Sequence, residues 1–210
     1  MTDKGYFVIT DICGYTEYLV RSELDHANEI LQYLFNTQIE AIKHPFVISD
    51  FHGDAIFMYV PETSVVAPQS MLEDLEKLYF VFADTLQQME NNLTCTCRAC
   101  RNMPKLGLKM VIHYREYVLQ KIGDREKLLG ADVIVPHRML KNHVTEETGI
   151  PCYALFSEAA AQPLHLSELA HPLVSYSESY EHIGEVKMQI LDLQEVRLRE
   201  QEKSSRYRST

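Results

Sequence analysis

The sequence predicts an α+β fold in which helices pack on a mostly antiparallel sheet. Three observations lead to this prediction. Pairs of short β-rich segments separated by turn residues predict hairpins, helical periodicity predicts helices between these hairpins, and the strict strand–helix alternation of a doubly wound parallel sheet is absent. Because hairpin strands pair antiparallel, a sheet assembled from them is mostly antiparallel.

The first half of the chain supplies a strand, helices and one hairpin. Strand-forming residues predict a strand at Tyr6–Asp11. Apolar residues at helical spacing predict a following helix with Asp25 as its N-cap. Phe46–Ser49 and Ala55–Val60 flank a glycine-containing loop and predict a hairpin, and a long helix is expected from about Pro68 to Leu93.

The second half is expected to add more hairpins and helices. The predicted elements are a strand pair at Leu106–Tyr114 and Glu116–Ile122, a helix at Ala131–Lys141, a strand at Cys152–Phe156, a short helix capped by Ser157, and a strand pair at Ser175–Glu181 and Glu185–Leu193. We expect residues 1–193 to form one domain with a cysteine-rich insertion at about 94–104. Residues 194–210 are expected to form a charged tail that begins as a helix and frays.

Composition excludes several classes of protein. The chain has 210 residues, of which 46% are hydrophobic and 24% charged, as in soluble globular proteins. A net charge of −10 argues against binding of nucleic-acid polymers. No apolar run approaches the ~20 residues that cross a bilayer, and the N-terminal residues do not resemble a signal segment, so we expect a cytoplasmic protein without membrane contact. Five cysteines, an odd number, argue against a disulfide framework.

Two aspartates are candidates for binding a metal ion. Asp11 ends the first predicted strand, and Asp54 lies in the "HGD" turn of the first hairpin. If the first strand lies between the strands of that hairpin, both carboxylates emerge at one edge of the sheet, where they repel each other unless a cation separates them. Mg²⁺ or Mn²⁺ suits such a pair and leaves positions for phosphates, and the amides of the "CGYT" turn after Asp11 would favour a triphosphate. The alternative is a strand ending in Asp and a common Gly-Asp turn, without any ligand.

Several motifs resemble those of the class III adenylyl and guanylyl cyclases. "FVITDICGYT" resembles the family's strand ending in Asp-Ile-x-Gly-Phe-Thr, and "ISDFHGDAIF" resembles its second metal motif, a turn ending in Gly-Asp. "LKMVIHYREYVLQKIG", "LLGADVIVPHRML" and "YALFSEAAAQPL" resemble the next segments in the same order. The resemblance extends from about Tyr6 to Leu193.

The resemblance implies a ferredoxin-like sheet, a head-to-tail homodimer and a site at the subunit interface that binds ATP or GTP. In that family the 3′-hydroxyl attacks the α-phosphate and pyrophosphate leaves, with two Mg²⁺ or Mn²⁺ ions bound. By position, the residues that match the family's functional positions are Asp11 and Asp54 as metal ligands, Ile12 as a backbone carbonyl ligand, Gly14, Tyr15 and Thr16 as the phosphate turn, and Arg138 as the arginine that stabilises the transition state.

Other positions depart from the family pattern. Ile134 replaces the asparagine that orients the ribose, and an isoleucine side chain forms no hydrogen bond. At the base-selecting positions the chain has Asp50 and Lys127, which either resemble the guanylyl cyclase arrangement or form an ion pair that closes the pocket. Pro136 restricts the helix that carries Ile134 and Arg138, and Arg138 could instead form a surface salt bridge.

Cys95, Cys97 and Cys100 form a separate cluster in "TCTCRAC". Thiolates at this spacing can converge on one Zn²⁺, but a closed structural site needs a fourth ligand. Cys13, Cys152, a histidine or a residue of a dimer mate are candidates for it. The alternative is that these are surface thiols with redox activity.

Three functions therefore remain open at the level of sequence. The first is a divergent cyclase-like protein that binds a purine nucleoside triphosphate and forms a cyclic nucleotide. The second is a catalytically inactive cyclase-homology dimer that acts as a nucleotide- or partner-binding regulatory module. The third is a cysteine-based metal or redox sensor on the same scaffold.

Overall fold

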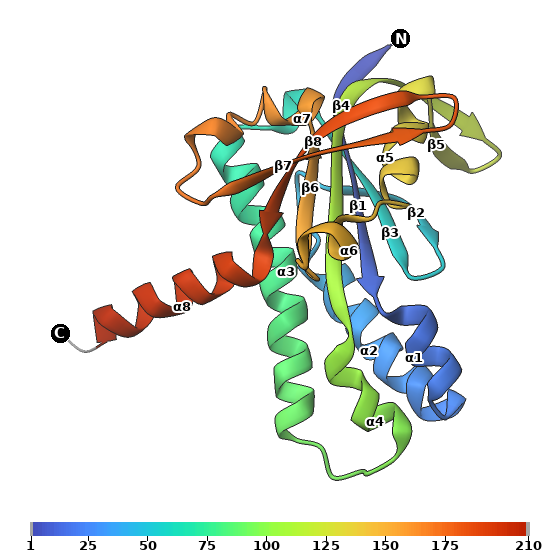
Figure 1. The fold of residues 1–210 in the computed structure, drawn as a ribbon. Coiled ribbons are helices and arrows are strands. Elements are labelled where there is room, and N and C mark those ends of the chain that lie inside the picture. Colours follow the sequence, from blue (N-terminus) through green and yellow to red (C-terminus); the bar gives the residue numbers. More distant parts are fainter. Residues whose placement is uncertain (1, 209–210) are drawn as a thin grey trace.

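The computed structural model describes residues 2–208 and has an α+β fold, which confirms the predicted class (Figure 1). Strands pair in the order β2-β3-β1-β4-β6-β8-β7, and β5 pairs with β4. All pairings are antiparallel except that of β4 with β6. The strands are β1 (Asp3–Cys13), β2 (Val47–His52), β3 (Ala55–Pro61), β4 (Gly107–Ile122), β5 (Arg125–Leu129), β6 (Tyr153–Ser157), β7 (Leu173–Tyr180) and β8 (Gly184–Asp192).

Helices lie on both faces of this sheet, and the larger core lies on the face covered by the two long helices α2 and α3. The α-helices are α1 (Tyr15–Arg21), α2 (Leu24–Ala41), α3 (Pro68–Asn91), α4 (Arg98–Asn102), α5 (Ile134–Met139), α6 (Val144–Thr148), α7 (Glu158–Ala161) and α8 (Leu193–Arg208). Short 3₁₀ segments occur at Glu62–Ser64, Met103–Lys105, Ala131–Val133 and Leu166–Glu168. No helix within residues 2–208 is long and apolar enough to cross a membrane.

The alternation of side chains along β1 decides which face Asp11 occupies. Tyr6, Val8 and Ile12 join the large core formed with α2 and α3, whereas Phe7 and Ile9 pack on the opposite face, in the small cluster that contains Val133. Because strand side chains alternate, Asp11 belongs to the Phe7 and Ile9 face. Asp11 is therefore directed to the side of the sheet that the long helices leave uncovered.

The strand order corrects one expectation about the two aspartates. β1 does not lie between the hairpin strands β2 and β3; it pairs with β3 on one side and β4 on the other. Asp11 is opposite Ala55 in the β1–β3 register. Asp54, which precedes Ala55, therefore still lies at the same end of the sheet as Asp11.

The predicted strand pair at Leu106–Tyr114 and Glu116–Ile122 was wrong, because this segment forms the single strand β4. The residues at the supposed turn, Tyr114 to Glu116, include no turn former. The chain instead reverses at Gly123, whose φ of 62° suits a glycine, and returns as β5.

Two predicted helix caps had different outcomes. Asp25 is not an N-cap, since α2 begins at Leu24 and its N-cap residue is Glu23, two residues before Asp25. Ser157 does cap α7, because its side chain accepts a hydrogen bond from the Ala160 amide at 3.3 Å. The helix expected at Ala131–Lys141 is shorter, a 3₁₀ turn followed by α5.

The C-terminal segment forms a regular helix up to Arg208. α8 leaves the end of β8 and extends away from the sheet beyond α3 (Figure 1). Leu193 and Val196 are buried in the main core, so the first turn of α8 is anchored there. Arg197 pairs with Asp84 of α3 through a 2.6 Å contact.

Candidate functional site

Asp11 and Asp54 form a pair of interacting carboxyl groups at one end of the sheet. Both side chains are partly buried. Burial raises the pKa of Asp54, and the neighbouring carboxylate of Asp11 raises it further, as expected where two like charges face each other. A carboxyl pair of this kind favours a cation between its members, so its chemistry fits a divalent ion.

Lys109 is a partner of Asp11 that the sequence motifs did not indicate. Its Nζ lies 3.2 Å from Asp11 Oδ2, and both side chains are largely buried, with 20% and 17% exposure. The two residues are opposite each other in the β1–β4 register. Lys109 Nζ also donates to the carbonyl oxygen of Leu140 at 3.3 Å, so this ammonium group links β1 to the segment after α5.

The predicted phosphate turn follows β1 directly. Gly14 has a φ of 80° and is the N-cap residue of α1, which begins with Tyr15 and Thr16. A left-handed conformation here favours glycine, and a Cβ at this position would lie 3.3 Å from the carbonyl oxygen of Lys105. Ile12, whose carbonyl is the predicted third metal ligand, has its side chain in the core.

Arg138 and Ile134 both lie on α5, over the face of the sheet that carries Asp11. Among the side chains that the structure describes, none forms a hydrogen bond or ion pair with Arg138, so the surface salt bridge considered from the sequence is not formed. Ile134 is 53% exposed. His137 packs its ring against Phe57 at a centroid distance of 4.8 Å, which fixes α5 on β3.

The predicted base-selecting residues contact each other. Lys127 Nζ lies 2.7 Å from Asp50 Oδ2, and this hydrogen bond is the main reason that the pKa of Asp50 falls below its ordinary value. The two side chains line an open pocket of about 650 Å³ between β2 and the β4–β5 hairpin. Of the two arrangements considered from the sequence, the structure contains the ion pair.

His113 is a buried histidine of the core. Its Nδ1 lies 2.8 Å from Ser157 Oγ, and burial lowers its pKa to about 4. This environment keeps the imidazole neutral and hydrogen-bonded to Ser157, the residue that caps α7.

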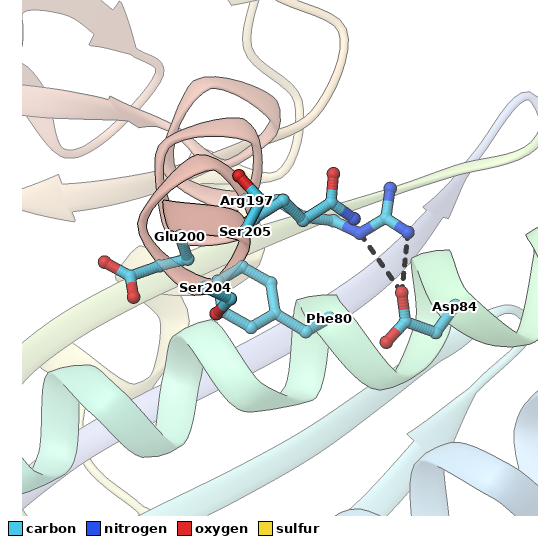
Figure 2. A pocket seen from close by; sticks show the side chains of 7 residues that line it. Phe80, Asp84, Arg197, Glu200, Ser204 and Ser205 are labelled. Atoms are coloured by element: carbon cyan, nitrogen blue, oxygen red, sulfur yellow. Dashed lines mark hydrogen bonds and ion pairs between the residues drawn. The ribbon is translucent and has the colours of Figure 1, made fainter. Parts of the chain in front are cut away.

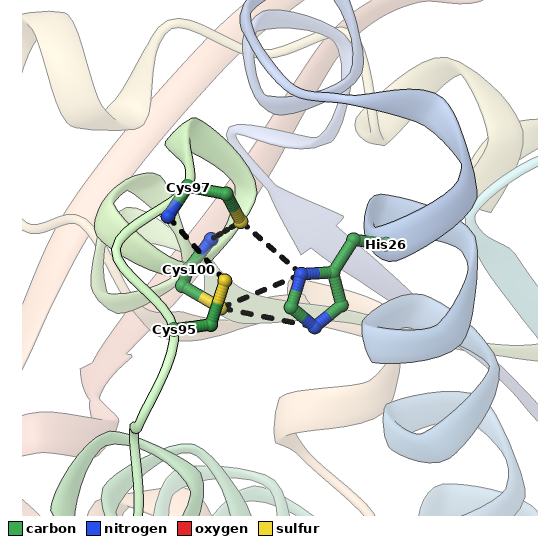
Figure 3. Close-up of side chains that lie close together, drawn as sticks. All are labelled: His26, Cys95, Cys97 and Cys100. Atoms are coloured by element: carbon green, nitrogen blue, oxygen red, sulfur yellow. Dashed lines mark hydrogen bonds between the residues drawn. The ribbon is translucent and has the colours of Figure 1, made fainter.

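The three clustered cysteines lie next to a histidine from a distant part of the chain. His26, in the first turn of α2, contacts Cys97 and Cys100, and Figure 3 shows its ring directed at the three thiols. The backbone amide of Cys100 donates a hydrogen bond to Cys97 Sγ. This hydrogen bond is the main reason that the pKa of Cys97 is lowered to about 7. Burial raises the pKa of Cys100 to about 12. This His26, Cys95, Cys97, Cys100 cluster could bind a metal ion.

A further pocket, of about 480 Å³, lies between α3 and α8 (Figure 2). Phe80 and Asp84 of α3 and Arg197 and Glu200 of α8 line it. None of the predicted site residues is among its lining residues, so this pocket is separate from the aspartate pair.

The fold matches solved catalytic domains of nucleotide cyclases over almost the whole chain. A bacterial light-regulated adenylyl cyclase superposes with a TM-score of 0.67 at 11% identity, covering 92% of each chain. The guanylyl cyclase Cya2 gives a TM-score of 0.65 at 12% identity over 91% of this chain and 92% of its own. The guanylate cyclase domain of RhGC from Catenaria anguillulae in complex with GTP gives 0.61 at 14% identity, over 91% and 97%. At these identities the similarity shows the class III cyclase fold.

Sequence comparison identifies closer relatives. "Uncharacterized protein Rv2561/Rv2562" of Mycobacterium tuberculosis is 31% identical over 164 residues, which are 76% of this chain and 72% of that protein. Residues 31–148, more than half of the chain, match the model of a family described as "Protein of unknown function (DUF2652)". The chain therefore belongs to the DUF2652 family and has the fold of a class III nucleotide cyclase domain.

Proposed function

We propose that this protein is a divergent cyclase-like protein that binds a purine nucleoside triphosphate with Mg²⁺ or Mn²⁺ at Asp11 and Asp54. The observation that carries the proposal is the interaction of these two carboxyl groups beside the Gly14 turn, on the sheet face that α2 and α3 leave uncovered. Their mutual repulsion makes a divalent cation favourable there. The Cya2 and RhGC domains, which share this fold, support a nucleotide as the ligand of that cation.

In this proposal the chain's own residues position the triphosphate. Asp11 and Asp54 would hold the ions together with the Ile12 carbonyl, and Gly14, Tyr15 and Thr16 would bind phosphate oxygens. When bound, the ions lower the pKa of the attacking hydroxyl and neutralise phosphate charge. Lys109 forms an ion pair with the Asp11 carboxylate, and its positive charge would also attract the phosphates of a bound triphosphate.

Arg138 would act from the second subunit of a head-to-tail homodimer. Its guanidinium group is held by no described side chain, so it is available to a pentacoordinate phosphate across the interface. Ile134, one turn earlier, offers the ribose no hydrogen bond. Losing a contact that orients the reacting groups costs about 10²-fold in rate, so we expect slow formation of a cyclic nucleotide and pyrophosphate.

A second candidate function, a non-catalytic nucleotide-binding module, is favoured by the Asp50–Lys127 ion pair. A 2.7 Å contact between these residues occupies the groups that would otherwise read the base. In this case the triphosphate binds through its phosphates and metal, without turnover and with little preference between ATP and GTP.

Titration calorimetry with ATP or GTP in MnCl₂ tests the proposal. We expect binding that requires the metal and falls at least about 10-fold in Asp54→Asn, since one ligand carboxylate is lost. Glu73→Asn, a change of an exposed carboxylate on α3, is the control and should bind as the wild type does. Absence of metal-dependent binding of either nucleotide would refute the proposal. Pyrophosphate release by the same sample then separates the cyclase from the module.

A further inference from the structure

Four potential metal ligands converge from two segments that are far apart in the sequence. His26 belongs to the first turn of α2, and Cys95, Cys97 and Cys100 belong to the loop after α3 and to α4. One ligand atom from each residue lies within 4.8 Å of all the others. In Figure 3 the four side chains point toward one common centre between α2 and α4.

The separations suit tetrahedral coordination. His26 Nδ1 lies 3.1 Å from Cys97 Sγ and 3.7 Å from Cys100 Sγ. With Zn–S bonds of ~2.3 Å and Zn–N bonds of ~2.0 Å, tetrahedral geometry places neighbouring ligand atoms about 3.5–3.8 Å apart. Small side-chain movements therefore suffice to seat one ion.

Backbone amides already donate to the sulfur atoms of this cluster. The Cys97 amide donates to Cys95 Sγ at 3.4 Å, and the Cys100 amide donates to Cys97 Sγ at 3.4 Å. Such hydrogen bonds stabilise negative charge on sulfur, which is the form that binds a metal. The backbone of the C-x-C-x-x-C loop therefore already provides hydrogen bonds that would stabilise thiolate ligands.

The surroundings of the cluster are pre-organised. Glu23 accepts hydrogen bonds from Arg98 Nε at 2.9 Å and from the Ala99 amide at 3.0 Å, which ties the start of α4 to the corner between α1 and α2. The hydroxyl of Tyr18 is buried, has no hydrogen-bond partner among the described residues, and interacts electrostatically with Cys100 and Cys97. This hydroxyl therefore lies close enough to the cluster to interact with the charge of its thiols.

We propose that His26, Cys95, Cys97 and Cys100 form a structural zinc site that fastens the loop after α3 to the start of α2. Three thiolates and one imidazole, with no position left for water, are the donor set of a closed structural zinc site. The site is independent of the proposed nucleotide site, which contains different residues. Its effect is to hold the segment before β4 against α1 and α2.

Metal analysis of the full-length protein, purified without chelator, tests the proposal. We expect about one zinc per chain, and replacement by Co²⁺ should give the thiolate-to-metal charge-transfer bands and intense d–d bands of a tetrahedral site. Removal of the zinc should lower the melting temperature, because the folded chain, in which all four ligands converge, binds the metal more tightly than the unfolded chain.

Single substitutions locate the site. His26→Asn and Cys95→Ser should each reduce zinc to well below one per chain; Cys95 is exposed, so its change leaves the core intact. The control variants are His182→Asn, whose side chain is 81% exposed, and Cys13→Ser, which removes a thiol outside the cluster. Both controls should keep the zinc and the cobalt spectrum.

Several results would overturn the zinc site. These are a protein without stoichiometric metal that also fails to bind Co²⁺, a stoichiometric metal other than zinc, or zinc that persists in folded His26→Asn and Cys95→Ser. A disulfide among the three cysteines in protein purified under reducing conditions would equally reject the site and favour redox thiols.

Discussion

At the scale of single residues, position 134 is where the proposed site departs from the cyclase pattern, because Ile134 replaces the asparagine expected there. Ile134 is 53% exposed on α5, so its side chain is available to a ligand or a second subunit but forms no hydrogen bond. Two residues later Pro136 is buried against the sheet. The exposed position can therefore accept a polar side chain without disturbing the core.

We predict that Ile134→Asn increases the rate of cyclic nucleotide formation by about 10- to 100-fold, because the asparagine amide can orient the ribose. Product is measured by chromatography after incubation with MnATP or MnGTP. Ile134→Val is the matched control and should not change the rate. Equal rates in both variants, with nucleotide binding intact, would show that this position does not limit turnover.

A single residue, Lys109, also makes the two carboxyl groups of the aspartate pair different from each other. Lys109 compensates Asp11, whereas Asp54 is left with a raised pKa. Of the two, Asp54 is therefore the carboxyl group that holds its proton more tightly than an ordinary aspartate does. Nucleotide binding should therefore weaken as the pH falls and Asp54 becomes protonated, and the Asp54→Asn variant should not show that pH dependence.

At the scale of elements, the contact between α3 and α8 holds the C-terminal helix. Burial, and then the charge of Glu200, raise the pKa of Glu76 on α3 to about 7, with a further contribution from Glu73 and a smaller opposite one from Lys203. The unfolded chain releases this proton near the ordinary value of 4.5. The folded state thus holds the proton more tightly, and the free energy of unfolding falls as the pH rises from about 4.5 to about 7.

We predict that Glu76→Gln raises the melting temperature at pH 8 by about 2–8 °C and leaves it nearly unchanged at pH 4, where the wild-type carboxyl is also neutral. Thermal denaturation followed by circular dichroism at both pH values gives the comparison. Glu90→Gln, which changes an exposed carboxyl group of α3 that does not contribute to the pKa of Glu76, is the control. An increase in melting temperature that is as large at pH 4 as at pH 8 would contradict this explanation.

At the scale of the whole molecule, the proposed site needs two chains. Asp54 and Arg138 would then serve one site from different subunits, as in a head-to-tail dimer. Because each closed two-fold dimer contains two equivalent sites, a mixed dimer of two different inactive variants has one intact site.

We predict that Asp54→Asn and Arg138→Ala are each inactive alone and that equal amounts mixed and allowed to exchange recover about a quarter of the wild-type rate. Half of the dimers are then mixed, and each has one working site of two. Pyrophosphate release measures the recovery, and two differently tagged samples of Asp54→Asn serve as the control for exchange. No recovery despite demonstrated exchange would place both residues in the same subunit's site.

Much of the fold followed from local patterns. Strand propensity at Tyr6–Asp11 and helical periodicity at Pro68–Leu93 predicted β1 and α3 within a few residues, because each pattern reflects one buried face. The reversal at Gly123 was missed, since a long regular strand and two shorter ones have the same alternation. The site positions Asp11, Asp54 and Arg138 came from motifs, and their roles remain predictions.

The sequence by itself determined the α+β class and the likeness to the cyclase family. It placed Asp11 at the end of the first strand, which in the structure continues two residues further to Cys13. Only the tertiary structure decided that Lys109 pairs with Asp11, that Lys127 pairs with Asp50, and that His26 contacts Cys97, which is 71 positions away. The physical reason is that periodicity and turn chemistry act between neighbours in the chain. Contacts between distant side chains depend on strand register and helix packing, which no local pattern encodes.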